Sequence, residues 1–150
     1  MEGMPVKLTS SDLNMLSQIE KLPNTTLQGE VRELVADNYF IRNGYTPLNG
    51  KCGSNCFDGV YLKDGKIYIS EVKPLNTDGT IKLSPKNDAT NLAAQMPDKW
   101  IADAIGALRR SGSPESIRTA HAISVAMDSC KLVKVISGIN QDGMTVVKLR

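Results

Sequence analysis

The sequence predicts an α/β protein in which a central mixed β-sheet is flanked by helices. Segments with apolar residues at helical spacing alternate with short segments rich in β-branched residues, and an Asp-Gly turn joins two of the latter. At 150 residues the chain is long enough for one core and too short for two comfortable domains. We therefore expect a single domain over residues 1–150.

The N-terminal part is predicted to begin with a helix. Ser10 or Ser11 can cap it, and leucine and isoleucine residues follow at helical spacing. Pro23 and Asn24 then end it, because proline cannot continue a helix.

A second helix is expected over about 27–42. Thr25 and Gln28 have the spacing of a capping box at its start, and an Asn-Gly pair ends it. Residues that recur at intervals of three and four predict a buried stripe along it. Glu30 lies on this stripe, where an acid is otherwise costly, although a carboxylate near a helix start is also favoured by the helix dipole. The stripe consists of Leu27, Val31, Leu34, Asn38 and Ile41.

A β-hairpin is predicted over 58–73, DGVYLKDGKIYISEVK. Asp64-Gly65 lies between two β-rich runs, which is the strongest short-range signal for a two-residue type I′ turn. The two-residue loop fixes the register of the strands and places Asp58 directly opposite Glu71. Because side chains alternate across a strand, one face becomes an apolar patch with two carboxylates and an amine at its end. This face holds Asp58, Val60, Leu62, Ile67, Ile69, Glu71 and Lys73.

The charges at the end of this hairpin suggest a metal site. Like charges directly opposite each other, about 5 Å apart, destabilise a hairpin, and a neighbouring apolar patch adds a desolvation cost. A hard divalent cation between the carboxylates of Asp58 and Glu71 would reverse the sign of their interaction, and Lys73 can hold a water beside it. The alternative is a hairpin whose end charges are solvated, with Glu71 and Lys73 merely ion-paired.

The segments around the hairpin complete the expected sheet and its covering helices. A short strand is expected at 45–48, and 74–89 reads as a long loop. A helix follows with Pro97 in its first turn and an end near Gly112. Its inner face is predicted to carry Trp100, Ile101, Ala104, Ile105 and Leu108.

A further helix begins at Ser113, and two final strands are predicted at 131–139 and 144–150. On that helix Ile117, Ala120, His121 and Ser124 are expected to pack inward. We interpret His121 as a packed or hydrogen-bonded residue rather than a catalytic base.

Three cysteines add little to this picture. Cys52 and Cys56 have a C-x3-C spacing, which fits ordinary thiols or a local disulfide, and Cys130 stands alone. A zinc site would need more ligands than one histidine and one distant cysteine supply.

These motifs together resemble a known superfamily. A helix glutamate, a D-(x12)-E-x-K pattern across a hairpin and a following helix are similar to the PD-(D/E)xK phosphodiesterases, which have the restriction-endonuclease-like fold. The resemblance covers roughly 27–110, although Phe57 stands where the motif has proline. The segment AAQMPDKWI at 93–101 is similar to nuclease toxin domains at the C-termini of large bacterial secreted proteins, of the contact-dependent growth inhibition and filamentous-haemagglutinin type.

The resemblance implies roles for particular residues. Asp58, Glu71 and the main-chain carbonyl of Val72 would bind a divalent metal, Mg²⁺ first, with Mn²⁺ and Zn²⁺ as alternatives. Lys73 would be the catalytic lysine. Two further residues would assist, Glu30 as the helix-borne acid and Gln95 as an auxiliary site residue.

The implied function is that of a metal-dependent nuclease toxin that hydrolyses phosphodiester bonds. Aromatic residues make up only 5% of the chain, which favours duplex DNA over an RNA loop with splayed bases. The alternatives are a tRNA-cleaving toxin on the same fold and a non-catalytic binding module.

The same resemblance implies partners and a location. It implies an acidic cognate immunity protein, secretion as part of a larger cell-surface protein, and action in the cytoplasm of a target bacterium. The net charge of +2 permits a polyanionic partner without demanding one. Because the apolar runs are short, we expect no stable membrane insertion by this domain.

Overall fold

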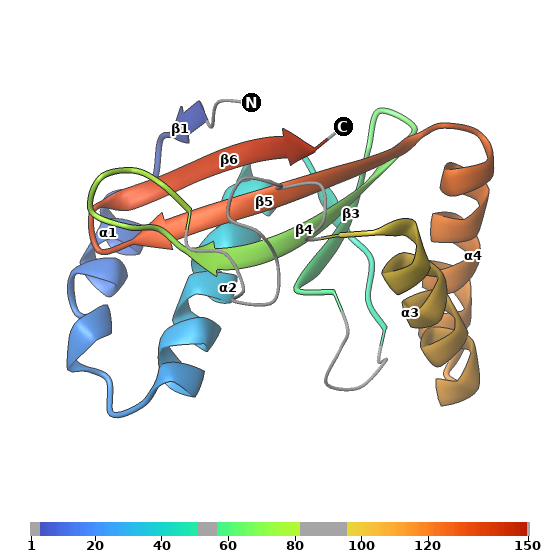
Figure 1. Cartoon of the computed structure of the whole chain (residues 1–150), viewed down its shortest axis with the longest axis horizontal. Coiled ribbons are helices and arrows are strands. Elements are labelled where there is room, and N and C mark those ends of the chain that lie inside the picture. Colours follow the sequence, from blue (N-terminus) through green and yellow to red (C-terminus); the bar gives the residue numbers. More distant parts are fainter. Residues whose placement is uncertain (1–3, 51–56, 82–95, 150) are drawn as a thin grey trace.

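One mixed β-sheet forms the centre of the computed structural model, which describes residues 4–50, 57–81 and 96–149 (Figure 1). Within these residues the sheet has six strands in the order β1-β6-β5-β4-β3-β2. Only the β4–β5 pair is parallel. The prediction of an α/β fold with a central mixed sheet is confirmed. The strands are β1 (Met4–Val6), β2 (Thr46–Pro47), β3 (Gly59–Lys63), β4 (Lys66–Pro74), β5 (Leu132–Asn140) and β6 (Gly143–Leu149).

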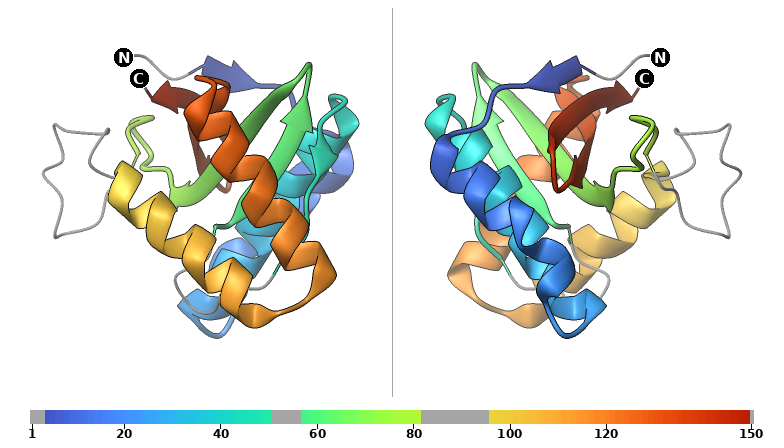
Figure 2. Two further views of the ribbon diagram at one scale, coloured as in Figure 1. Left: turned by 90° about the vertical axis from the view of Figure 1, so that its right-hand side faces the viewer. Right: turned by 90° about the vertical axis from the view of Figure 1, so that its left-hand side faces the viewer.

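Helices cover both faces of the sheet (Figure 2). On one face lie α1 (Ser10–Ser17) and α2 (Thr25–Arg42), joined through the short 3-10 helix η1 (Ile19–Lys21). On the other lie α3 (Asp98–Ser111) and α4 (Pro114–Asp128). No helix among the described residues combines the length and the apolarity that crossing a membrane requires.

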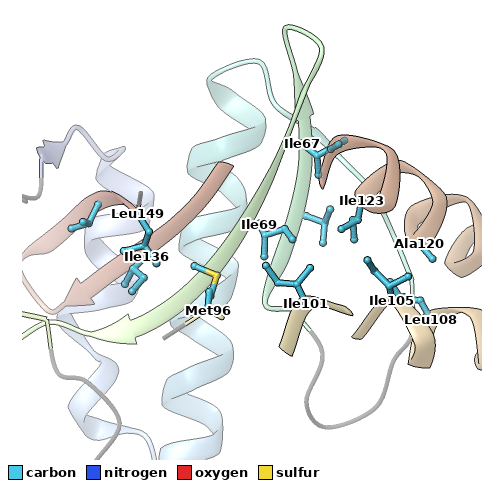
Figure 3. Packing of buried hydrophobic residues seen from close by; sticks show 13 residues of the cluster. Ile67, Ile69, Met96, Ile101, Ile105, Leu108, Ala120, Ile123, Ile136 and Leu149 are labelled. Carbon is cyan, nitrogen blue, oxygen red and sulfur yellow. The ribbon is translucent and has the colours of Figure 1, made fainter. Parts of the chain in front are cut away.

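Alternation along the central strands divides the interior into two cores. Ile67 and Ile69 of β4 face α3 and α4, where Figure 3 shows them beside the isoleucines of those helices. Tyr68, between them in the chain, faces α2 on the opposite side. The predicted inner face of α3 is confirmed in its four buried residues, Ile101, Ala104, Ile105 and Leu108, while Trp100 is half-buried against Phe57.

The predicted helix caps need correction at three positions. Thr9 caps α1, because its Oγ1 accepts a hydrogen bond from the Asp12 N–H at 3.1 Å. Asn24 caps α2, with its Oδ1 accepting from the Leu27 N–H at 2.9 Å. Pro97 occupies the N-cap position of α3 and not its first turn. For α1 and α2 the cap lies one or more positions before the predicted one, whereas α3 begins later than predicted, at Asp98.

The buried stripe predicted on α2 is also wrong at three of its five positions, while Val31 and Asn38 are half-buried. Leu27, Leu34 and Ile41 are 36%, 49% and 47% exposed. The buried residues of the helix are instead Val35, Ala36 and Phe40. The ring of Phe40 stacks on Tyr61 of β3 with 4.6 Å between centroids. This aromatic contact, together with edge-on packing against Tyr45, turns a different side of α2 toward the sheet.

Two further differences concern α4 and the first strand. The inward face of α4 carries Ser116, Thr119, Ala120, Ile123 and Ala126, whereas Ile117 and His121 are exposed. Apart from Ile123 these inward residues are short or polar, which hides the face from a search for apolar periodicity. The sequence also did not predict β1, whose partner strand β6 lies at the far end of the chain.

Some predictions fall on residues outside the described ranges. These are Gln95, Cys52, Cys56 and the second half of the loop expected at 74–89. Its first half is described as far as Ile81, which forms a bridge with Leu75. Cys130 is an exposed free thiol.

Candidate functional site

The hairpin between β3 and β4 has the turn and the register predicted for it. Asp64 and Gly65 both have positive φ, 51° and 75°, as a type I′ turn requires. Lys63 pairs with Lys66 beside the turn, and the ladder continues from there to Gly59 and Ser70.

Asp58 lies where this ladder ends. The pairing stops at Gly59, but β4 continues to Pro74 alongside β5. In place of a main-chain partner, the Asp58 Oδ2 accepts a hydrogen bond from the Val72 N–H at 2.8 Å. In an antiparallel pair the N–H and C=O of one residue point to the same neighbour. The Val72 carbonyl is therefore directed to the side where the Asp58 carboxylate lies.

Glu71 is an acid that is costly to ionise. Its burial and the neighbouring charge of Asp58 raise its pKa to about 8, while the charge of Lys73 opposes this rise. Because like charges close together disfavour ionisation, the pair tends to keep a proton when no cation is present. Asp58 and Lys73, the two groups predicted beside Glu71, are therefore close enough to change its pKa.

Glu33 is a third carboxyl at this position, and sequence reasoning missed it. A hydrogen bond with the Asp58 carboxyl, partial burial and the charges of Asp58 and Glu30 raise the pKa of Glu33 to about 7. Glu30 is exposed, although it lines the same pocket of about 430 Å³ as Glu33 and Asp58. In this orientation of α2, which also exposes Leu34, it is Glu33 that makes the hydrogen bond with Asp58. The available signal was the three-residue spacing of the two glutamates, which puts them on one helix face.

Asp58 also lines a second pocket. This pocket has a volume of about 180 Å³ and is bordered by Asp37, Tyr61 and Thr119. The Tyr61 hydroxyl donates to Asp37 Oδ1 at 2.8 Å, and burial raises the pKa of Tyr61. Asp58 thus lines two pockets.

The donor set of this cluster fits a hard divalent cation. Carboxylate and carbonyl oxygens suit Mg²⁺ and Mn²⁺ better than Zn²⁺, which prefers nitrogen and sulfur ligands. The charge of Asp58 contributes to the raised pKa values of Glu33 and Glu71, and a bound cation would oppose that contribution. No group of three or more His, Cys, Asp or Glu side chains in the described ranges is arranged to hold a metal ion. Mg²⁺ commonly uses only one or two carboxylates with water and substrate phosphate, so a site on Asp58, Glu71 and a carbonyl would not need a third acidic side chain.

The sequence also singled out Lys73, His121 and Gln95. Lys73 is half-buried, and its ammonium makes no ion pair with a described residue, which leaves it able to contact water or phosphate. His121 is exposed on α4 and borders a separate groove with Leu62 and Val125. Gln95 lies outside the described residues.

Comparisons of the chain with protein-family models, with curated proteins and with solved structures find no match.

Proposed function

We propose that the chain is a metal-dependent endonuclease with a restriction-endonuclease-like fold, which hydrolyses phosphodiester bonds with DNA favoured over tRNA. The observation that carries the proposal is the contact of Asp58 with two acids of raised pKa, Glu33 and Glu71, beside Lys73. Clusters of titratable groups with strongly raised pKa values are typical of functional sites. A mixed sheet with helices on both faces agrees with such a fold.

The residues of the cluster have distinct roles in the proposed reaction. Asp58, Glu71 and the Val72 carbonyl would hold Mg²⁺, which polarises a phosphate and lowers the pKa of water when bound. Lys73 orients the attacking water and stabilises the negative charge that develops on the phosphate oxygens. The water oxygen bonds to phosphorus and gives up a proton, while the bond to the leaving oxygen breaks and that oxygen takes up a proton. Glu33, in hydrogen-bond contact with Asp58, would be placed to take up the proton that the attacking water loses.

Cleavage assays on two substrates test this proposal. The purified chain is incubated with plasmid DNA and with tRNA, in Mg²⁺, in Mn²⁺ and in EDTA. We expect metal-dependent cleavage that Asp58→Ala abolishes. Asp142→Ala is the matched control, because Asp142 is exposed in the β5–β6 turn. Nucleic-acid binding without cleavage under every metal condition would favour a non-catalytic binding module.

We further propose that the nuclease is a toxin delivered by a larger secreted cell-surface protein into the cytoplasm of a target bacterium. The support is the resemblance of residues 93–101 to secreted toxin nucleases. A nuclease of this kind would damage its producer, so an acidic immunity protein that covers the cleft is expected, and charge complementarity would make its association fast.

Expression in bacteria tests the toxin proposal. The wild-type chain should stop growth, Asp58→Ala should not, and the neighbouring open reading frame should rescue the wild type. Normal growth with an active wild-type enzyme in the cytoplasm would contradict the toxin proposal and leave the nuclease proposal standing.

A further inference from the structure

Arg32 of α2 lines the same pocket as the carboxylate cluster. This pocket of about 430 Å³ brings Arg32 together with Glu33, Asp58 and Val72. Among the described residues that line it, Arg32 is the single cationic one. A permanent positive charge therefore borders a cleft whose other charged groups are acids.

One donor of the Arg32 guanidinium lacks a partner among the described residues. Its Nε is buried and has no hydrogen-bond partner among the described residues, and burial lowers the pKa of the group. Glu30 and Glu33 lie nearby, but neither forms an ion pair with it in the described ranges. Arg42 on the same helix shows the contrast, because its Nη1 pairs with a buried Asp12 carboxylate at 3.1 Å.

A buried donor without a partner calls for an explanation, and a ligand supplies one. The planar guanidinium presents donors in a fork that matches two oxygens of a phosphate. A nucleic acid that approaches Asp58 and Glu33 also meets their negative charge, which a cation at the pocket wall offsets. Arg32 occupies that place, on the α2 side of the cluster.

We propose that Arg32 binds the phosphodiester next to the carboxylate cluster and so positions the nucleic-acid backbone in the cleft. The inference rests on the proposed function, which supplies the nucleic acid. Arg32 would add a contact from α2 to the nucleic-acid backbone. The hairpin provides the other groups, Asp58, Glu71 and Lys73. Arg32 then acts in substrate affinity, whereas Lys73 acts in the chemical step.

Binding without cleavage tests Arg32. Fluorescence anisotropy in EDTA at neutral pH measures the Kd of a short DNA duplex and of tRNA for the wild type, Arg32→Gln, Arg32→Lys and the control Lys148→Gln. Lys148 is exposed on β6, so its change removes one charge away from the pocket. Arg32→Gln should raise the Kd about tenfold, and Arg32→Lys about threefold because the fork is lost. Lys148→Gln should change it by less than about twofold, and the salt dependence should lose about one phosphate contact only in Arg32→Gln.

The outcomes separate this inference from the nuclease proposal. Wild-type Kd and salt dependence in Arg32→Gln would overturn the role of Arg32, even if the wild type cleaves DNA. A wild type that binds neither nucleic acid would overturn it as well. A third outcome is that Arg32→Gln weakens binding but the wild type cleaves nothing with Mg²⁺ or Mn²⁺. This would support phosphate binding by Arg32 and contradict the nuclease proposal. Thermal unfolding checks the fold of each variant, and the Kd of Arg32→Lys decides the role of Arg32 if Arg32→Gln does not fold.

Discussion

Replacing Glu71 with glutamine is expected to stabilise the metal-free protein at alkaline pH and to leave its stability unchanged in acid. Burial and the charge of Asp58 raise the pKa of Glu71 from an ordinary 4.5 to about 8 in the folded chain. A carboxyl with a raised folded pKa holds its proton more tightly when folded. Its contribution to stability is complete below the unfolded pKa and is lost as the pH rises through the folded pKa. Glutamine has nearly the shape of the neutral acid and cannot ionise.

The size of the effect follows from the two pKa values. Each pH unit between them corresponds to about 1.4 kcal/mol, so the interval from 4.5 to about 8 sets an upper bound of about 5 kcal/mol. Glu71 interacts strongly with Asp58, and the cost of ionisation is spread over the pair. We therefore expect Glu71→Gln to raise the free energy of unfolding by about 2 to 4 kcal/mol at about pH 9 and by nearly nothing at about pH 4.

Urea unfolding in EDTA between these pH values measures the difference. Glu20→Gln is the control, because Glu20 is an exposed acid in η1. Adding Mg²⁺ or Mn²⁺ at alkaline pH should stabilise the wild type and not Glu71→Gln, since a cation favours the ionised carboxyl. Stability curves for wild type and Glu71→Gln that run parallel across the pH range would refute the reasoning.

Three other predictions concern the site and its support. Lys73→Ala should lower single-turnover cleavage by about 100-fold or more while the Kd for DNA changes less than about twofold; a large affinity loss with normal cleavage would contradict this. Glu33→Gln should reduce cleavage and alter the pH–rate profile near neutrality, with a smaller loss for the exposed Glu30→Gln; equal losses would contradict it. Arg42→Ala should lower the free energy of unfolding by about 2 kcal/mol, because buried Asp12 loses its ion pair. Urea unfolding measures this difference, and an unchanged free energy of unfolding would contradict the prediction.

Local signals in the sequence were enough to predict the hairpin and the register of its two strands. The Asp64-Gly65 pair determines the turn, and the turn determines the register that sets Asp58 beside Glu71 and Val72. The inner face of α3 was predictable for a similar reason, because its apolar residues follow one helical period. Such predictions need only contacts between residues close in the chain.

The place of Glu33 beside Asp58 could not be predicted in this way. The rotation of α2 depends on contacts of Phe40 with Tyr45 and Tyr61, and Tyr61 belongs to the hairpin that follows. The short strand β1 was missed because it gains its hydrogen bonds from β6, at the other end of the chain. Packing between elements decides both the orientation of α2 and the formation of β1. Periodicity within one element carries no information about such packing.

The unequal lengths of β3 and β4 explain why the cluster forms at this place. β5 pairs with β4 in parallel as far as Pro74, so one edge of β4 is held along its whole length. On its other edge the β3 ladder ends at Gly59, and the Val72 N–H is bound by the Asp58 carboxylate. A strand that continued the ladder would occupy this edge with main-chain groups. The fold thus satisfies a part-buried donor with a carboxylate, and that carboxylate brings the charge that a cation or a protonated neighbour must balance.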